Sequence, residues 1–174
     1  IGGNLGAAKY EAAVRGTQTS ALIFGGFSAG ALATNELYNG TSWSEQNDLN
    51  TARNTLAGAG TSTAMLAFGG NPAPSLAFTE EYNGTSWSEQ NDMAQTRDSL
   101  AGCGTQTAAL GAAGFVSGPY ASGSTQVVEE YDGTNWTSAT SVPGSYGKAG
   151  LTAAGTQTAA ISTGGGHSRS LIHI

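Results

Sequence analysis

Few side chains of this sequence could do acid–base, metal or nucleophilic chemistry. The two histidines, His167 and His173, both fall within the last eight of 174 residues, and no acid or nucleophile stands beside them in a known catalytic pattern. We expect both in loop or strand-face positions, with metal ligation as the alternative. The single cysteine, Cys103, cannot form a disulfide within the chain. It occupies LAGCGTQ where a sister segment reads LAGAGTS, which predicts a small buried side chain in preference to a reactive thiol.

The carboxylates are no better arranged for catalysis. Glu80-Glu81 and Glu129-Glu130 are adjacent pairs, and adjacent residues of a strand point to opposite faces, so neither pair forms an acid–base couple. The Gly-Gly pairs lack the strand–helix context of a phosphate-binding loop. We therefore expect no active site, no cofactor and no metal, and a chain that is not an enzyme.

The composition excludes several partners. Charged residues make up 10% of the chain and the formal net charge is −6, with neither a basic patch nor a basic helix. This argues against nucleic acid and against an anionic membrane surface. No apolar stretch approaches the roughly 18 residues of a membrane-spanning helix. No signal peptide is recognisable, and the sequence looks like an excised piece of something larger.

An internal repeat organises nearly the whole chain. A Gly-Thr landmark recurs with spacings of 44, 44 and 51 residues, and three further landmarks move with it. They are an apolar run before two small residues, a cation seven residues before the Gly-Thr, and a tyrosine five residues before a tryptophan. The repeats cover about 7–50, 51–94, 95–145 and an incomplete 146–174, and we expect one single unit over 1–174.

Each repeat predicts four short strands and no helix, because glycine and β-branched residues are dense and no 3.6-residue period persists. The unalternating apolar run, such as MLAF in 65–68, predicts an inner strand covered on both faces. Asn-Gly at 39–40 and 83–84 predicts a type I′ hairpin turn. A turn explains Asn39, Asn83 and Asn135, which also match the N-glycosylation sequence, so modification remains an alternative. Four antiparallel strands per repeat indicate an all-β propeller blade.

The sequence resembles the kelch-repeat family of β-propellers. The resemblance is carried by the double glycine, by the Glu-x-Tyr-Asn/Asp-Gly-Thr-x-Trp segment and by the basic residue ahead of each blade, over roughly 7–174. It departs at Ala113-Gly114, where the first glycine is lost, and in the last repeat, which stops before its tyrosine and tryptophan. A fainter similarity links the Gly-x-x-Trp segment to the Asp-box of sialidase propellers, without the defining aspartate. Copper chemistry of the galactose-oxidase kind would need a Tyr/His/Cys set that the repeats lack.

Kelch propellers usually have six or seven blades, so the resemblance implies about 3.5–4 four-stranded blades here, roughly half a ring. SRSLIHI at the end can supply a third strand of the fourth blade. Three arrangements could complete the ring. The chain is a fragment, or two chains share one ring, or IGGNLG at the start supplies the missing outer strand. Open strand edges and blade faces favour some closure or partner.

Two repeated sets of residues have predicted structural roles. We expect Trp43, Trp87 and Trp136 to fill the wedge between blades, with sugar stacking as the alternative. Four cations occupy one repeated position, and three acids recur two residues before the repeat tyrosine. We expect each cation to meet a carboxylate or a strand-end carbonyl, with a cation ring facing an anionic ligand as the alternative. The cations are Lys9, Arg53, Arg97 and Lys148, and the acids are Glu36, Glu80 and Glu129.

One loop varies, and variable loops on a rigid scaffold commonly bind partners. Fifteen residues separate Gly114 from Glu129, against ten in the first two repeats. We expect a loop at 115–128, with Phe115, Pro119 and Tyr120 as candidate ligand-binding residues and neutral drift as the alternative.

These patterns favour a non-enzymatic structural or adhesive module that binds a protein or a cell-surface glycan. It would act as a homo-oligomer or within a larger propeller, without nucleic acid or membrane insertion. The Ser/Thr/Gly/Ala-rich composition is similar to extracellular adhesins, appendage subunits and phage tail fibres, which favours an extracellular, virion or cell-surface location. The alternatives are a carbohydrate-binding or carbohydrate-active propeller and an intracellular adaptor.

Overall fold

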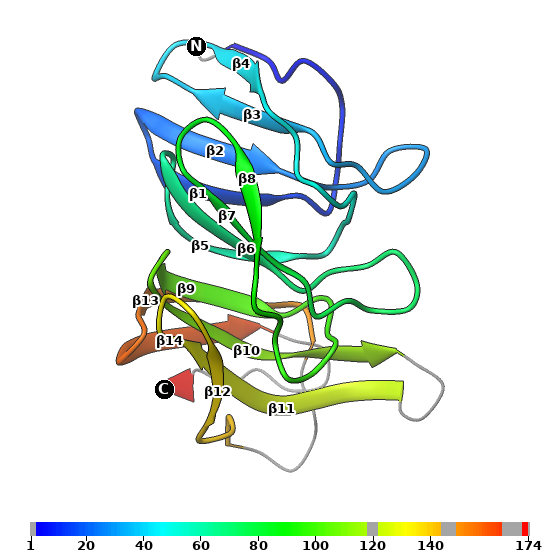
Figure 1. Cartoon of the computed structure of the whole chain (residues 1–174), viewed down its shortest axis with the longest axis vertical. Coiled ribbons are helices and arrows are strands. Elements are labelled where there is room, and N and C mark those ends of the chain that lie inside the picture. Colours follow the sequence, from blue (N-terminus) through cyan, green and yellow to red (C-terminus); the bar gives the residue numbers. More distant parts are fainter. Residues whose placement is uncertain (1–2, 118–121, 144–148, 165–171, 174) are drawn as a thin grey trace.

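The computed structural model describes residues 3–117, 122–143, 149–164 and 172–173, and this part of the chain is all-β without a helix (Figure 1). It consists of three four-stranded antiparallel sheets and one three-stranded sheet, each with its strands in chain order. We call these sheets blades 1 to 4. The arrangement is that of a propeller-like array of blades.

Each blade takes its strands from one repeat. Blade 1 contains β1 (Ala13–Thr17), β2 (Ser20–Phe24), β3 (Asn35–Tyr38) and β4 (Trp43–Gln46). Blade 2 contains β5 (Ala57–Thr61), β6 (Ala64–Phe68), β7 (Thr79–Tyr82) and β8 (Trp87–Gln90). Blade 3 contains β9 (Ala101–Thr105), β10 (Ala108–Ser117), β11 (Ser122–Tyr131) and β12 (Trp136–Ala139). Blade 4 contains β13 (Leu151–Thr156), β14 (Ala159–Gly164) and β15 (Ile172–His173), which confirms that the final segment adds a third strand.

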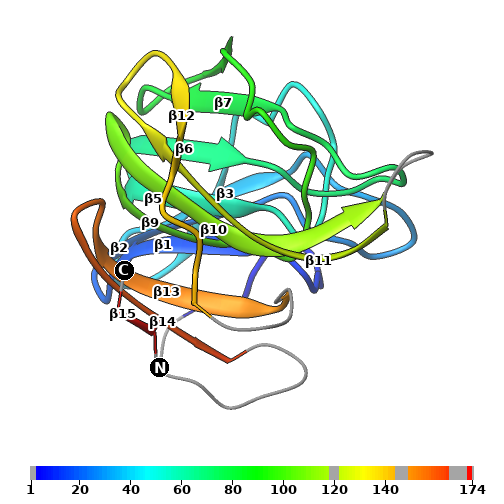
Figure 2. The same cartoon turned by 90° about the horizontal axis from the view of Figure 1, so that it is seen from below.

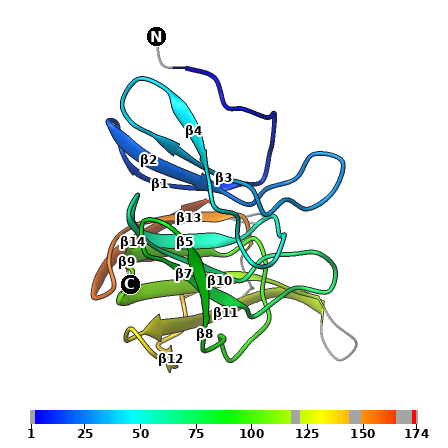
Figure 3. The same ribbon diagram turned by 45° about the horizontal axis from the view of Figure 1, so that its top comes forward.

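The first strands of the blades lie side by side in the order β1, β5, β9, β13, and the later strands fan outward. Blade 1 and blade 4 stand at the two ends of this row, and Figure 3 shows blade 1 with one face turned away from the other blades. Four strands can converge at the centre because they are built from small residues, as in AGAGT of β5 and AGCGT of β9. The apolar runs form the second strands and not the innermost ones, which are the Gly/Ala segments. The second strand β6 is covered on both faces as expected, whereas β14 of blade 4 is buried on one face and exposed on the other.

One large side chain interrupts the row of small central residues. Arg15 on β1 takes the position that Ala59, Cys103 and Ala154 occupy in the other first strands. Its Nε donates to the carbonyl of Gly58 on β5 at 2.9 Å, and its Nη2 donates to the carbonyl of Gly102 on β9 at 2.6 Å. One guanidinium therefore ties three blades together, and its burial lowers the pKa of Arg15 from the ordinary value.

The hydrophobic core is divided into three clusters, one between each pair of neighbouring blades. Phe24 of blade 1 packs against Trp87 of blade 2 with ring centroids 5.3 Å apart, and Phe68 of blade 2 packs against Trp136 of blade 3 at 4.9 Å. Trp87 and Trp136 are buried, whereas Trp43 at the end of the row is only half-buried. A repeat tryptophan is therefore buried where a preceding blade packs against it, as for Trp87 and Trp136.

The third-to-fourth strand connections are not type I′ turns, so that prediction is wrong. Tyr38 pairs with Trp43 across a four-residue loop, and only Gly40, with φ +93°, takes the left-handed conformation. A type I′ turn would require positive φ at Asn39 as well. Instead the Asn39 Oδ1 accepts hydrogen bonds from the backbone N–H groups of Thr41 and Ser42, both at 3.0 Å. The side chain, and not the backbone handedness, explains this asparagine.

The start of the chain runs along blade 1. The N–H of Gly3 donates to the carbonyl of Thr41 at 2.9 Å, and the N–H of Gly6 donates to Glu36 Oε2 at 2.7 Å. Of the three arrangements that could complete the ring, the one in which this segment supplies the missing outer strand of the fourth blade is therefore excluded for residues 3–6. Residues 3–6 take the place that the links between blades take elsewhere, where Asn50 and Ala94 bind the corresponding glutamates.

Candidate functional site

The blade array has two ends with different character. At one end, which we call the turn end, short turns join first to second and third to fourth strands. At the other, the loop end, lie the second-to-third strand connections and the links between blades. In Figure 1 the turn end is on the left and the loop end on the right. The ion pairs, the exposed aromatic rings and the candidate loop all belong to the loop end.

Three of the four repeated cations form buried ion pairs there. Arg53 Nη2 lies 3.0 Å from Glu80 Oε1, Arg97 Nη2 lies 2.7 Å from Glu129 Oε1, and both arginine side chains are fully buried. A third pair joins the Lys9 Nζ to Glu36 Oε1 at 2.9 Å. The fourth cation, Lys148, lies outside the described residues.

Each arginine joins two blades. The backbone N–H of Arg53 donates to Leu32 and its carbonyl accepts from Gly26, both in blade 1. Its Nη1 donates to the carbonyls of Gly69 and Phe78 in blade 2 at 3.2 and 2.7 Å. Arg97 repeats the pattern between blades 2 and 3, with its Nη1 donating to the carbonyls of Ala113 and Val127. The positive charges of Arg53 and Arg97 are therefore paired with carboxylate and carbonyl groups inside the protein.

Desolvation dominates the electrostatics of these arginines. Burial lowers the pKa of Arg53 and that of Arg97 from the ordinary arginine value, while the partner carboxylates Glu80 and Glu129 oppose the shift. A fully buried guanidinium with carbonyl and carboxylate partners has no access to a soluble anion. The geometry therefore disfavours the alternative of a cation ring facing an anionic ligand, at least for these two positions.

The candidate loop at 115–128 is largely strand, which corrects the expectation. The extra residues lengthen β10 and β11 into a hairpin in which Phe115 pairs with Ser124, and these strands project further toward the loop end than β6 and β7 (Figure 2). A bulge at Ala113, with φ +58°, keeps the backbone conformation that Gly69 has with φ +67°. The alanine therefore replaces glycine without changing the chain path. Phe115 is 37% exposed, and Pro119 and Tyr120 lie outside the described residues.

Hydrogen bonds tie this hairpin to the loop of the neighbouring blade. The Ser75 N–H, from the blade 2 loop, donates to Ser117 Oγ at 2.8 Å, and the Ser117 N–H donates back to Ser75 Oγ at 3.1 Å. Ser75 Oγ also donates to the buried carboxylate of Asp98 at 2.7 Å. The Asp98 backbone in turn forms two hydrogen bonds with Phe115. These hydrogen bonds hold the blade 2 loop and the β10–β11 hairpin in a fixed relative position in the unbound chain.

Exposed aromatic rings gather on the same end. Phe78 at the end of the blade 2 loop is 41% exposed, and Tyr10 in front of blade 1 is 56% exposed. The Tyr10 ring packs against Phe27 with centroids 5.4 Å apart. With Phe115 they place one exposed ring at the loop end of each of blades 1, 2 and 3.

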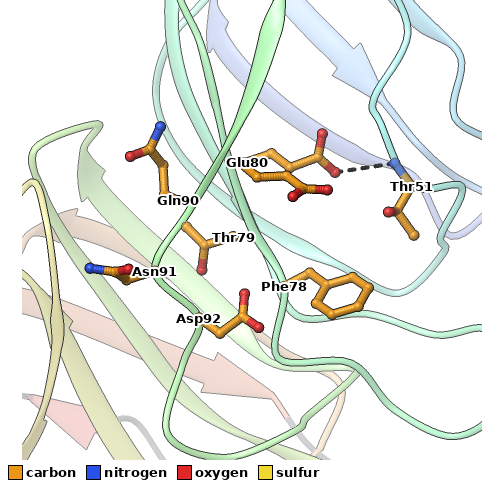
Figure 4. Close-up of a pocket in the computed structure, with 8 residues that line it drawn as sticks. Thr51, Phe78, Thr79, Glu80, Gln90, Asn91 and Asp92 are labelled. Atoms are coloured by element: carbon orange, nitrogen blue, oxygen red, sulfur yellow. Dashed lines mark hydrogen bonds between the residues drawn. The ribbon is translucent and has the colours of Figure 1, made fainter.

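A polar depression of about 330 Å³ lies beside Phe78 at the rim of blade 2 (Figure 4). Glu80 in its wall is already bonded to Arg53 and to the Thr51 N–H. The groups that stay available are the exposed carboxylates of Glu89 and Asp92 and the amide oxygen of Asn91, whose Nδ2 already donates to the Thr134 carbonyl and to Asn135 Oδ1, both at 3.0 Å. Their equivalents in blade 3 are Ser138, Thr140 and Ser141, whereas blade 1 repeats them as Glu45, Asn47 and Asp48. The lining residue that distinguishes blade 2 from blade 1 is Phe78, which stands where blade 1 has Thr34.

The sequence did not reveal the Ser75–Asp98–Ser117 contacts. Asp98 stands where the sister repeats have Tyr10 and Asn54, and that break in the pattern is the signal that could have singled it out. His173 belongs to β15, and His167 lies outside the described residues. Within the described ranges, no three or more His, Cys, Asp or Glu residues are grouped to hold a metal ion. No helix in that part of the chain is long and apolar enough to cross a membrane.

The sequence matches no protein-family model. No curated protein matches it either.

Proposed function

We propose that the chain is a non-enzymatic binding module of structural or adhesive type, built as a kelch-like propeller segment, that contacts its partner through the loop end. The observation that carries the proposal is the hydrogen-bond network of Ser75, Asp98 and Ser117, which joins two loop-end segments. Phe115 is exposed on the strand segment bonded to Asp98, and Phe78 is exposed at the end of the loop that contains Ser75. The proposed partner is a protein or a cell-surface glycan, in an extracellular, virion or cell-surface setting.

The physical argument is one of preorganisation. Loops that are already hydrogen-bonded to each other lose little conformational entropy when a partner binds. Aromatic side chains supply much of the binding energy at such surfaces, because they bury a large area with few rotatable bonds. The strongly interacting charges of the repeats are used within the scaffold, as Arg53 with Glu80 illustrates. We therefore expect specific contacts with a partner to come from the segments that differ between blades, such as the β10–β11 hairpin.

A second candidate function is carbohydrate binding. The depression beside Phe78 combines an exposed aromatic ring with the carboxylates of Glu89 and Asp92 and the amide of Asn91. Sugars offer hydroxyl groups to carboxylate and amide acceptors and C–H faces to aromatic rings. A lectin site would therefore use blade 2 more than the long hairpin.

Two probes separate these functions, a random-peptide display library and an array of neutral and sialylated glycans. The protein-binding proposal expects selected peptides that bind the wild type and lose at least about tenfold in affinity with Phe115→Ala, since a central aromatic anchor contributes 1.4 kcal/mol or more. The matched control is Thr63→Ala, an exposed residue at the turn end, which should bind unchanged. Glycan binding that is lost with Phe78→Ala would replace the protein-binding proposal with the lectin. Peptides that bind both variants like the wild type would contradict a loop-end site.

A further inference from the structure

The face of blade 1 that turns away from the array has the make-up of a buried interface. We define the leading face of a blade as the one toward the preceding blade, and the trailing face as the one toward the next. The leading face of blade 2 contributes Met65, Ala67, Tyr82 and Trp87 to the core shared with blade 1. The same positions of blade 1 are held by Ala21, Ile23, Tyr38 and Trp43.

The internal interfaces show which trailing residue such a face accepts. The rings of Phe24 and Phe68 lie over Gly58 and Gly102, where an added Cβ would approach the ring Cζ to 2.6 and 2.7 Å. Between blades 3 and 4 the same positions hold Ala112 and Ala153, which pack in one cluster. A large trailing side chain therefore meets glycine, and a small one meets a residue with a Cβ.

The two open faces follow the same rule. On the leading face of blade 1 the glycine position is Val14, which is 45% exposed. Val14 would collide with a phenylalanine placed as Phe24 is. On the trailing face of blade 4 the phenylalanine position is Thr163, which is exposed, with Ile161 beside it at 41% exposure. At the internal interfaces a phenylalanine faces a glycine. At the two open faces the corresponding residues are two side chains of medium size, Thr163 and Val14.

A polar contact also matches. Gln106 in the first turn of blade 3 donates through Nε2 to the carbonyls of Met65 and Tyr82 in blade 2, at 3.0 and 2.8 Å. Gln157 of blade 4 makes the same two bonds to Ala109 and Tyr131 in blade 3. Blade 1 has the equivalent Gln18, which is exposed and has no partner among the described residues. Its donor is placed for the second strand of a blade that precedes blade 1.

We propose that the leading face of blade 1 binds the trailing face of blade 4 of a second copy of this chain, so that two copies close one ring head to tail. Among the described strands, blades 1 and 4 stand at the two ends of the row of first strands, so neither the leading face of blade 1 nor the trailing face of blade 4 has a further blade beside it in that row. A repeated contact between two different faces closes into a ring or continues as a fibre. The match of Val14 with Thr163 favours contact between these two faces, and the number of copies distinguishes the ring from the fibre. This proposal rests on the assembly role of the module and not on loop-end binding.

The test is the molar mass in solution over a range of concentrations. The wild type is expected at twice the 17.4 kDa of the chain. Thr163→Phe should give the single-chain mass, because its ring meets Val14. The double variant Val14→Gly with Thr163→Phe rebuilds the internal glycine–phenylalanine pair and should restore the doubled mass. Phe78→Ala at the loop end is the control and should keep the wild-type mass.

Three results would overturn the proposal. A wild type at 17.4 kDa at every concentration would show that no second copy is bound. A doubled mass that Thr163→Phe leaves intact would place the dimer contact elsewhere. Chains longer than two copies would show that the contact does not close. Loss of peptide binding by Phe115→Ala is a separate readout, so failure of this contact and failure of the loop-end site are distinguishable.

Discussion

The ring of Phe24 on β2 occupies the space in which a side chain on Gly58 of β5 would lie, with its Cζ 2.6 Å from the position of an added Cβ. The glycine is needed for this close approach and not for a special backbone angle, because its φ is not in the left-handed region. The same relationship recurs between Phe68 and Gly102. The small residues of the central strands are therefore matched to the aromatic residues of the neighbouring blade.

Gly58→Ala is expected to destabilise the chain by about 1–3 kcal/mol, the usual cost of overpacking a core. The double variant Gly58→Ala with Phe24→Leu should cost less than the sum of the single variants, because the leucine vacates the space that the new methyl group needs. Urea unfolding measures all three free energies. Gly30→Ala is the control, since nothing lies within 4 Å of its added Cβ, and it should cause no loss. Strictly additive costs would show that the two residues do not compete for space.

Arg53→Ala is expected to destabilise the chain by about 3–5 kcal/mol, because it leaves the carboxylate of Glu80 buried without its partner. Glu80→Gln together with Arg53→Met should cost less than the two single variants combined, which a double-variant cycle from urea unfolding measures. Glu89→Gln, an exposed acid on the next strand, should stay within about 0.5 kcal/mol of the wild type. Peptide binding by folded Arg53→Ala should be unchanged, and a stable variant with lost binding would contradict the structural role.

Asp132 provides a pH-dependent contrast with Asn39 and Asn83, which hold the same turn in blades 1 and 2. Its Oδ1 accepts hydrogen bonds from the N–H groups of Asn135 and Thr134 at 2.7 and 2.9 Å, and these lower the pKa of the Asp132 carboxyl. A lowered folded-state pKa stabilises the fold above the ordinary carboxyl pKa of about 4, and this stability is lost as the pH falls through the folded-state value.

Asp132→Asn should therefore gain stability relative to the wild type as the pH falls from about 5 to about 2, where the wild-type carboxyl becomes protonated. Urea unfolding at several pH values, beside an NMR titration of the carboxyl carbon, measures the difference. A constant difference between the two proteins over that interval would contradict the contribution of the charge to this turn.

Cys103 is predicted to react slowly with alkylating agents. Its side chain is buried, and this burial raises the pKa of the Cys103 thiol, an effect that the nearby Arg15 only partly offsets. Since the thiolate is the reacting form, modification by iodoacetamide at neutral pH should be at least about 100-fold slower in the native chain than in urea. Mass spectrometry follows the rate. Equal rates in both conditions would show that the strand β9 is exposed in solution.

The sequence predicted much of the fold because the repeat marks each blade several times. The apolar runs, the Gly-Thr turns and the tyrosine-to-tryptophan spacing all survive in the strands, and Cys103 is small and buried as expected. The turn at Asn39 was mispredicted because Asn-Gly fits two turn types, and only the register of Tyr38 with Trp43 distinguishes them. Arg15 was overlooked, although it is the one large residue at its position in the four central strands.

The candidate site was less predictable for a physical reason. Extra residues between Gly114 and Glu129 lengthen a hairpin as readily as a loop, since the added segment can continue the pairing of β10 with β11. The contact between Ser75 and Asp98 joins two repeats across a blade interface, which no spacing within one repeat reveals. Sequence periodicity describes what the blades share, and the binding surface is built from what they do not.

The most direct test of the loop-end surface is amide hydrogen exchange of the chain with and without a display-selected peptide. The account predicts added protection in segments 69–78, 95–99 and 113–117, around Ser75, Asp98 and Phe115, and none in the turns at 39–42 and 83–86. Protection confined to the turn end or to the leading face of blade 1 would contradict it.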